Sequence, residues 1–237
     1  MHKNERRGSE LLLYKKLGCL HAHFSNVDYI QKAFSPYEIE LVHFVDPVLL
    51  YKVESVGSLQ AYDVKNKVKE QIEWLAQCAV DAILITCTAY IAMLEEVELS
   101  IFVPIIKIDE PFFAHICHMQ KQQTILFSNP ATVEGTIKRL QDYADSHHQM
   151  INFEIMTIPD SFELIMKGLK EQYDQKIRDI LHELTKIEDK VISVAQLSMS
   201  DAAQQVEKET TTMIINPLNT LVSSVVEQLK LKQKHLI

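Results

Sequence analysis

Cys87 is the residue of this sequence whose surroundings are best suited to chemistry. It follows the apolar run Asp81 to Ile85 and has Thr86 and Thr88 on either side. A thiol between a strand and a helix faces backbone N–H groups and a positive helix end, which lower its pKa and also bind carboxylates. Cys87 is therefore a candidate nucleophile or carbon-acid base. The alternative is a buried cysteine that only fills the core.

A second segment, from Lys190 to Met199, repeats this design. A charged residue again precedes the apolar run: Lys190 stands six residues before Gln196, as Asp81 stands six residues before Cys87. An amide cannot carry a proton as a thiol does. Ser198, which follows closely, is a poor acid or base unless a base lies beside it. The sequence therefore offers one obvious thiol and no obvious second proton carrier.

Other candidate binding residues follow expected strands, where ligands bind in open α/β sheets. His21 ends the first expected strand, and Ser128, Asn129 and Thr132 lie between a later strand and the next helix. These last three residue types also cap helices. For them ligand binding and capping are both open.

The sequence does not predict a metal site. His21 and His23 lie two residues apart and share one face if the first strand continues to His23, but no Asp or Glu is near them. Cys117 and His118 diverge by about 100° on a helix, so they do not share a ligand face. The remaining cysteines are expected in the core: Cys19, Cys78 and Cys117. The absence of a CxxC spacing favours reduced thiols.

Composition narrows the possible partners. The chain has 237 residues, 24 basic and 32 acidic side chains and a net charge of -8, which argues against binding to nucleic acid or an anionic membrane. No apolar run reaches the roughly 18 residues of a membrane span, and no signal peptide is apparent, so a cytoplasmic location is expected. Only five glycines occur, without GxGxxG or GxxxxGK, so no nucleotide cofactor is expected.

Short apolar runs alternate with amphipathic stretches, which is typical of an α/β protein with mainly parallel sheets. We expect two pseudo-symmetric halves with the site in the cleft between them: residues 1–111 with 210–237 carry Cys87, and residues 112–209 carry Gln196. Strands are expected at 16–22, 38–45, 82–86, 101–108, 124–127, 151–157, 191–195 and 213–215. Helices are expected at 26–34, 63–80, 89–95, 112–119, 132–143, 200–207 and 218–229, and residues 160–184 are expected to form one long or two broken helices.

Together these segments resemble the aspartate/glutamate/hydantoin racemase superfamily. The segments that carry the resemblance are 81–90, Val45-Asp46-Pro47, 103–111, 128–132 and 195–199. The resemblance implies a cofactor-independent enzyme in which two cysteines face each other across the substrate, one removing an α-proton and the other delivering one. By this resemblance Cys87 is the first cysteine, Thr86, Thr88 and Thr132 hold the substrate carboxylate, and Gln196 stands where the second cysteine is expected.

The missing second cysteine implies one-thiol chemistry. The expected function is that of an isomerase or lyase acting on a small carboxylated or amino-acid-like molecule, with Gln196 and Ser198 orienting a carboxylate. One alternative is an amino-acid racemase with a second base other than cysteine, for which His21 is the candidate. The other alternative is a carboxylate-binding protein without turnover. A homodimer is the expected assembly.

Overall fold

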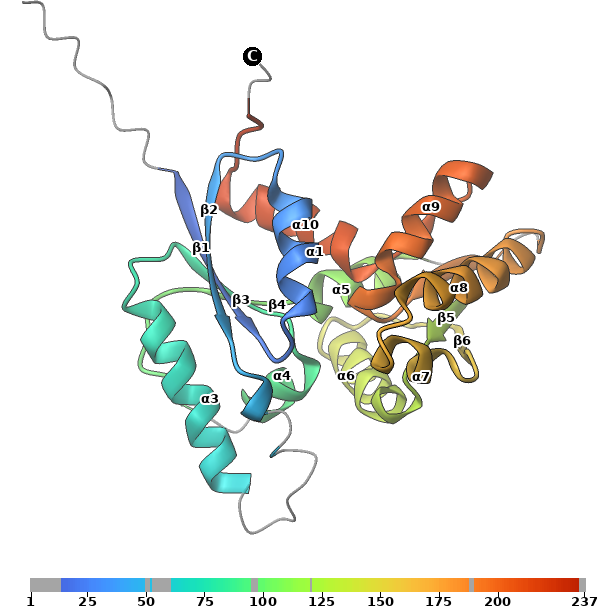
Figure 1. The fold of residues 1–237 in the computed structure, drawn as a ribbon. Coiled ribbons are helices and arrows are strands. Elements are labelled where there is room, and N and C mark those ends of the chain that lie inside the picture. The colour runs from blue at the N-terminus through green and yellow to red at the C-terminus, as the bar shows by residue number, and fades with distance from the viewer. Residues whose placement is uncertain are drawn as a thin grey trace, which may run out of the picture.

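The fold consists of two four-stranded, all-parallel sheets flanked by helices (Figure 1). The computed structural model describes residues 14–49, 52, 61–94, 98–119, 121–187 and 190–234. The first sheet contains β1 (Lys15–His21), β2 (Ile39–Val45), β3 (Ala82–Ile85) and β4 (Ile105–Lys107). The second contains β5 (Gln123–Phe127), β6 (Phe153–Thr157), β7 (Val191–Val194) and β8 (Ile214–Ile215).

The two sheets share one strand order. The first runs β2-β1-β3-β4 and the second β6-β5-β7-β8, so each half repeats the same crossover pattern. In both, the strand that leads to the candidate site, β3 or β7, lies at an inner position. The carboxyl ends of parallel strands meet at one edge of a sheet, which is where ligands bind in such folds. The two halves therefore present equivalent edges, as the repeated sequence design predicts.

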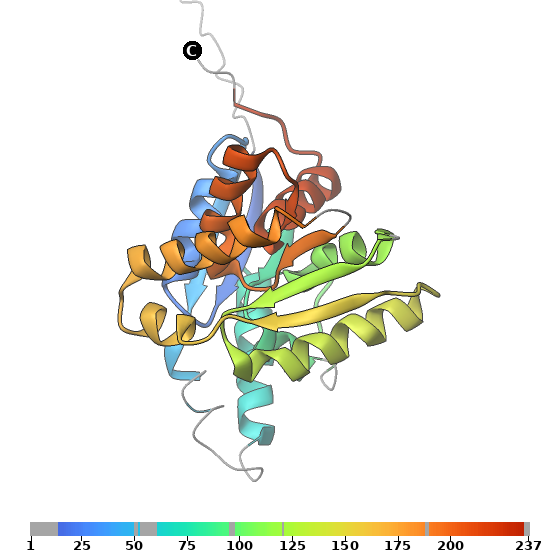
Figure 2. The same cartoon turned by 90° about the vertical axis from the view of Figure 1, so that its right-hand side faces the viewer.

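Helices cover both faces of each sheet. Figure 1 shows α3 on one side of the first sheet and α1 with α10 on the other. Figure 2 faces the second half, with α6 below its strands and α8 above. The helices are α1 (Ser25–Phe34), α3 (Ala61–Ala76), α4 (Thr88–Leu94), α5 (Asp109–His118), α6 (Val133–Ser146), α7 (Ser161–Met166), α8 (Lys170–Leu184), α9 (Ser200–Thr210) and α10 (Pro217–Leu229), with the short 3-10 helices η2 (Pro130–Thr132) and η3 (Leu197–Met199).

Strand alternation explains how these layers are filled. In β5, Leu126 packs into the core beneath α8 and α9, whereas Ile125 and Phe127 pack against α5 and α6. Every residue of this strand is buried, as expected of a parallel strand covered on both faces. The first half has one large apolar core, to which α10 contributes Leu221 and Val225. The chain thus returns to the first half at its end, although β8 pairs within the second sheet.

The expected fold class is confirmed, and most expected elements are present within a few residues. The expected helix at 63–80 ends at Ala76, so Cys78 lies in the following turn and is exposed; its assignment to the core was wrong. The expected strand at 101–108 is reduced to Ile105–Lys107, after Pro104. The expected segment 160–184 is two helices, separated at Gly168, which has a positive φ of 74°. The division of the chain at residues 111 and 210 stays a prediction.

Among the residues that the structure describes, no helix combines the length and the apolar character that a membrane crossing requires.

Candidate active site

Cys87 lies at the junction of β3 and α4. The backbone N–H of Ile91 donates to the Cys87 carbonyl at 3.0 Å, which is the first bond of the helix. The Cys87 side chain is half-buried and packs against the core of the first half. The expected position of this thiol, at the carboxyl end of an inner strand and the start of a helix, is therefore observed.

Thr86 anchors the first wall of the site through three hydrogen bonds. Its Oγ1 lies 2.9 Å from His21 Nδ1, accepts from Asn26 Nδ2 at 3.2 Å and donates to the Leu20 carbonyl at 3.3 Å. Since the one hydroxyl proton goes to Leu20, His21 must donate from Nδ1. Burial, and secondarily the neighbouring His43, lowers the pKa of His21 to about 4, so the ring is neutral at pH 7. His21 thus holds Thr86 from behind.

Gln196 occupies the corresponding place in the second half, and its amide makes three hydrogen bonds. Its Oε1 accepts from the Ser128 N–H at 2.7 Å and from Ser128 Oγ at 3.0 Å. Its Nε2 donates to Thr132 Oγ1 at 2.8 Å. Asn129 caps η2, with its Oδ1 accepting from the Ala131 N–H at 3.0 Å. Gln196 therefore fastens the loop after β5 to the loop after β7.

Ser198 belongs to a second polar chain in this half. The Tyr173 hydroxyl is buried and lies 2.9 Å from both Ser198 Oγ and Ser128 Oγ. It donates to Ser128, so Ser198 is the donor to Tyr173. Burial raises the pKa of Tyr173, which keeps the phenol protonated at neutral pH. Ser198 is thus oriented by a phenol and not by a base.

A cavity of about 190 Å³ joins the two sets of strand ends. Its polar lining comes from both halves: Asn26, Thr86, Thr88, Asp109, Thr136, Gln196 and Ser198. The apolar lining consists of Ile108, Phe112, Phe113, Ala195, Leu197 and Pro217. An apolar enclosure with a few convergent hydroxyl and amide groups is typical of a small-molecule site. Cys87 lies between two of the lining residues, Thr86 and Thr88.

Asp109 is the single ionisable side chain of this lining. Its Oδ2 accepts from Arg139 Nε at 2.9 Å, and both side chains are nearly buried, at 6% and 12% exposure. Its Oδ1 is buried without a hydrogen-bond partner, as is Arg139 Nη2. Burial raises the pKa of Asp109, and Arg139 offsets part of that rise. Asp109 therefore brings a partly unsatisfied carboxylate to the cavity wall.

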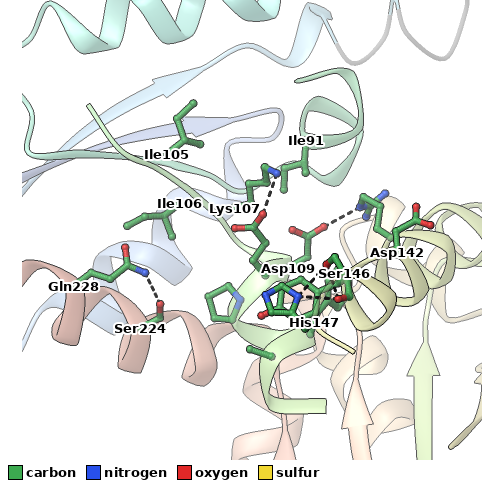
Figure 3. A pocket seen from close by; sticks show the side chains of 16 residues that line it. Ile91, Ile105, Ile106, Lys107, Asp109, Asp142, Ser146, His147, Ser224 and Gln228 are labelled. Atoms are coloured by element: carbon green, nitrogen blue, oxygen red, sulfur yellow. Dashed lines mark hydrogen bonds and ion pairs between the residues drawn. The ribbon is translucent and has the colours of Figure 1, made fainter. Parts of the chain in front are cut away.

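A larger cavity of about 600 Å³ shares Asp109 and Phe113 with the first (Figure 3). Its wall is more polar and carries Lys107, which pairs with Glu110 at 2.9 Å, and His147. It contains none of the strand-end residues that follow β3 or β7. We therefore assign the candidate site to the smaller cavity, where both halves supply side chains.

The structure brings four of the residues expected from the sequence to one cavity: Thr86, Thr88, Gln196 and Ser198. Ser128 and Thr132 lie directly behind Gln196, and Asn129 acts as a cap, so their contact with a ligand stays a prediction. His21 is buried behind Thr86. Sequence reasoning missed Asn26 and Asp109. Asp109 precedes Glu110-Pro111 at the start of a helix, where an aspartate is a common cap. The sequence alone therefore does not indicate that this carboxylate also lines a cavity.

Removing the Gln196 amide is expected to destabilise the second half. The Gln196→Met variant leaves the Ser128 N–H and hydroxyl without their acceptor, and Ser128 is 2% exposed. The expected loss is about 1–3 kcal/mol in the free energy of unfolding, measured by urea titration. Gln228→Met, an exposed glutamine on α10, is the matched control and should change stability by less than about 0.5 kcal/mol. Equal stability of the two variants would contradict this role of Gln196.

These features define a class of fold: two α/β halves with equivalent strand ends that face one cavity. Solved structures of aspartate and allantoin racemases share this fold. Aspartate racemase from Picrophilus torridus superposes with a TM-score of 0.69 at 14% identity, over 93% of this chain and 96% of that one. An aspartate racemase homologue from Pyrococcus horikoshii superposes with a TM-score of 0.65 at 13% identity, over 91% of this chain and 99% of that one.

Allantoin racemase from Klebsiella pneumoniae gives a TM-score of 0.62 at 17% identity, over 93% of this chain and 90% of that one. No protein-family model matches the sequence, and no curated protein matches it either. The likeness is therefore one of fold, which covers nearly the whole length of both chains.

Proposed function

We propose that the protein is a cofactor-independent isomerase or lyase that acts on a small carboxylate or amino-acid-like molecule through the thiol of Cys87. The observation that carries this proposal is the cavity lined by Thr86 and Thr88 on one side and by Gln196 and Ser198 on the other. Thr88 and Gln196 supply neutral donors of the kind that hold a carboxylate, and the thiol of Cys87 lies next to Thr88 in the chain.

Gln196 decides against a two-thiol racemisation. Its amide makes three hydrogen bonds to the loop after β5 and has no proton to exchange at neutral pH. A two-base mechanism needs a proton carrier on each face of the substrate. The second half supplies only hydroxyls and this amide among the residues that line the cavity. One-thiol chemistry is the simplest reaction that these side chains support.

Two such reactions are consistent with the site. In a decarboxylation, the C–C bond to the departing carboxylate breaks and its electrons form an enediolate. The Cys87 thiol then donates its proton to form the new C–H bond, and solvent reprotonates the thiolate. In an isomerisation, the thiolate adds to one carbon of a double bond, the resulting single bond rotates, and elimination re-forms the double bond and the thiolate. In both, the Thr88 hydroxyl and the Gln196 amide hold a carboxylate in place, because the hydroxyl protons of Thr86 and Ser198 are donated within the protein.

Asp109 favours a second candidate, an amino-acid racemase whose second base is this carboxylate. It is the ionisable group of the cavity wall, and its Oδ1 has no hydrogen-bond partner. A raised pKa brings a carboxyl group closer to the range that proton transfer requires. In this candidate Cys87 and Asp109 exchange protons with opposite faces of the α-carbon. His21, the base suggested by the sequence, would act only through Thr86.

A panel experiment in D₂O distinguishes these functions. The protein is incubated with α-amino acids, substituted malonates and unsaturated diacids, and NMR follows deuterium incorporation, loss of CO₂ and cis–trans conversion. The proposal predicts decarboxylation or isomerisation, each lost in Cys87→Ala. The second candidate predicts deuterium at the α-carbon of both enantiomers of an amino acid, lost in Asp109→Asn. Absence of every reaction contradicts both and leaves a carboxylate-binding protein. The expected homodimer is checked on the same sample by light scattering.

A further inference from the structure

We propose that Cys19, His21 and His43 form a binding site for a transition-metal cation, with Zn²⁺ the ion best suited. One ligand atom from each of these side chains lies within 4.8 Å of the other two, and this is the only such group of three in the part of the chain that the structure describes. None of the three lines the candidate active-site cavity. The site therefore adds to the proposed function without changing its chemistry.

The backbone brings these side chains together. Cys19 and His21 are two residues apart on β1, so they project from one face of the sheet. His43 lies on β2 directly opposite Cys19 in the strand register. All three ligands thus come from paired strands and not from loops. Sites on paired strands hold their geometry more closely than sites on loops.

The distances are close to those that a zinc ion requires. His21 Nε2 and His43 Nδ1 are 2.9 Å apart, and nitrogens at about 2.0–2.1 Å from a tetrahedral ion lie roughly 3.3 Å from each other. A thiolate at about 2.3 Å lies roughly 3.5 Å from each nitrogen. The ligand atoms lie within 4.8 Å of one another, so at most about 1.3 Å must close for the thiolate and the imidazoles to share an ion. Water or another small ligand completes the fourth position.

The contacts around His21 suit a metal ligand. Its Nδ1–H donates to Thr86 Oγ1, which directs the Nε2 lone pair toward His43. A hydrogen bond from the second ring nitrogen to a fixed acceptor is the usual way in which a metal-bound histidine is oriented. Without a metal, His43 Nδ1–H donates to this lone pair, and His43 Nε2 is buried without a partner. A core histidine that serves packing alone is normally satisfied.

The ligand types select the metal. One thiolate and two imidazoles suit Zn²⁺ and its analogue Co²⁺, whereas Mg²⁺ and Ca²⁺ require oxygen ligands. Binding replaces the Cys19 S–H proton, which leaves to solvent as the S–metal bond forms. β2 is the edge strand of the sheet and His43 is half-buried, which gives an ion a route to an otherwise buried site. A bound ion would fix His21 and, through it, the position of Thr86.

The test is a Co²⁺ titration of metal-free protein that carries Cys78→Ser, since Cys78 is an exposed thiol that could bind the ion on its own. We expect one equivalent of Co²⁺ with a thiolate-to-cobalt charge-transfer band and tetrahedral d–d bands, both removed by Zn²⁺. Cys19→Ser should remove the charge-transfer band, and His43→Gln should weaken binding at least about 10-fold. Cys87→Ser should leave the spectrum unchanged.

Three results overturn this proposal. They are the absence of stoichiometric binding, a charge-transfer band that persists in Cys19→Ser, and a band that depends on Cys87. If Cys19→Ser fails to fold, His43→Gln carries the test, because this half-buried edge-strand position tolerates substitution better. In that case unaltered affinity in His43→Gln overturns the proposal. None of these readouts depends on turnover, so the proposal can fail while the proposed function stands.

Discussion

Replacing Cys87 with serine is expected to lower turnover at least about 10³-fold, for whichever reaction the substrate panel identifies. A serine hydroxyl has nearly the volume of the thiol but is far less acidic, so it can neither supply a proton nor form a nucleophilic anion at neutral pH. The expected factor corresponds to about 4 kcal/mol of transition-state stabilisation. The measurement compares kcat of Cys87→Ser with that of the wild type under saturating substrate.

Ligand affinity should separate chemistry from binding in the same variant. Thr86, Thr88 and Ser198 line the cavity and are unaltered by the change at Cys87. The Kd of a dicarboxylate, measured by calorimetry, is therefore expected to change less than about 3-fold, against roughly 10-fold weakening in Thr88→Val, where a donor is lost. Cys78→Ser is the matched control and should keep full turnover. Turnover of Cys87→Ser within 10-fold of the wild type contradicts the assignment of the thiol.

Replacing Arg139 with methionine is expected to have the largest effect on stability. The change leaves the Asp109 carboxylate buried without its cation, since the two side chains pair at 2.9 Å with only 6% and 12% exposure. Removing one partner of a buried ion pair costs about 3–5 kcal/mol. Urea unfolding at pH 7 gives this difference. Arg178→Met, at a half-buried arginine that bonds Gln205 and carries no ion pair with a buried carboxylate among the described residues, is the control and should cost less than about 1 kcal/mol.

The pH dependence of the Arg139→Met variant provides an independent check. Burial raises the pKa of Asp109 even beside Arg139, and removal of that cation raises it further. The folded state then binds a proton that the unfolded state has released, so stability falls as pH rises from the unfolded to the folded pKa. The deficit of the variant should therefore shrink as the pH is lowered toward about 4, the ordinary aspartate value. A deficit that is constant with pH contradicts an uncompensated carboxylate.

The double variant Asp109→Asn with Arg139→Met tests the coupling of the pair. Its loss should be smaller than that of Arg139→Met alone, because no charge is then left buried. An additive result would show that the two side chains contribute separately. Because Asp109 also lines the cavity, ligand binding by the same double variant shows whether the Asp109–Arg139 pair also maintains the shape of the site.

The fold could be predicted from the sequence because its signals are local. Apolar runs followed by amphipathic stretches mark each strand and helix, and the matched runs before Cys87 and Gln196 indicate the repeated halves. The cavity residues beside these runs could be predicted for the same reason. Strand ends meet in any parallel sheet, so Thr86 and Gln196 needed no long-range information.

The remaining contacts depend on register and on packing between elements. The proximity of His43 to Cys19 follows from the pairing of β1 with β2, and no pattern in the sequence states that register. Asp109 faces the cavity and Arg139 because α5 packs beside α6, which a local reading cannot give. The early end of α3 at Ala76 exposes Cys78, although the 3.6-residue periodicity continues beyond it. Such features arise from tertiary structure and not from local propensity.

The most direct test of the central claim is a crystal structure of the protein with bound malonate. We expect the dicarboxylate in the cavity of about 190 Å³, with one carboxylate accepting hydrogen bonds from the Thr88 hydroxyl or the Gln196 amide, and with Cys87 Sγ within about 4 Å of its central carbon. Malonate bound only in the larger cavity beside Lys107, or bound with Cys87 turned away from it, would contradict the proposed site.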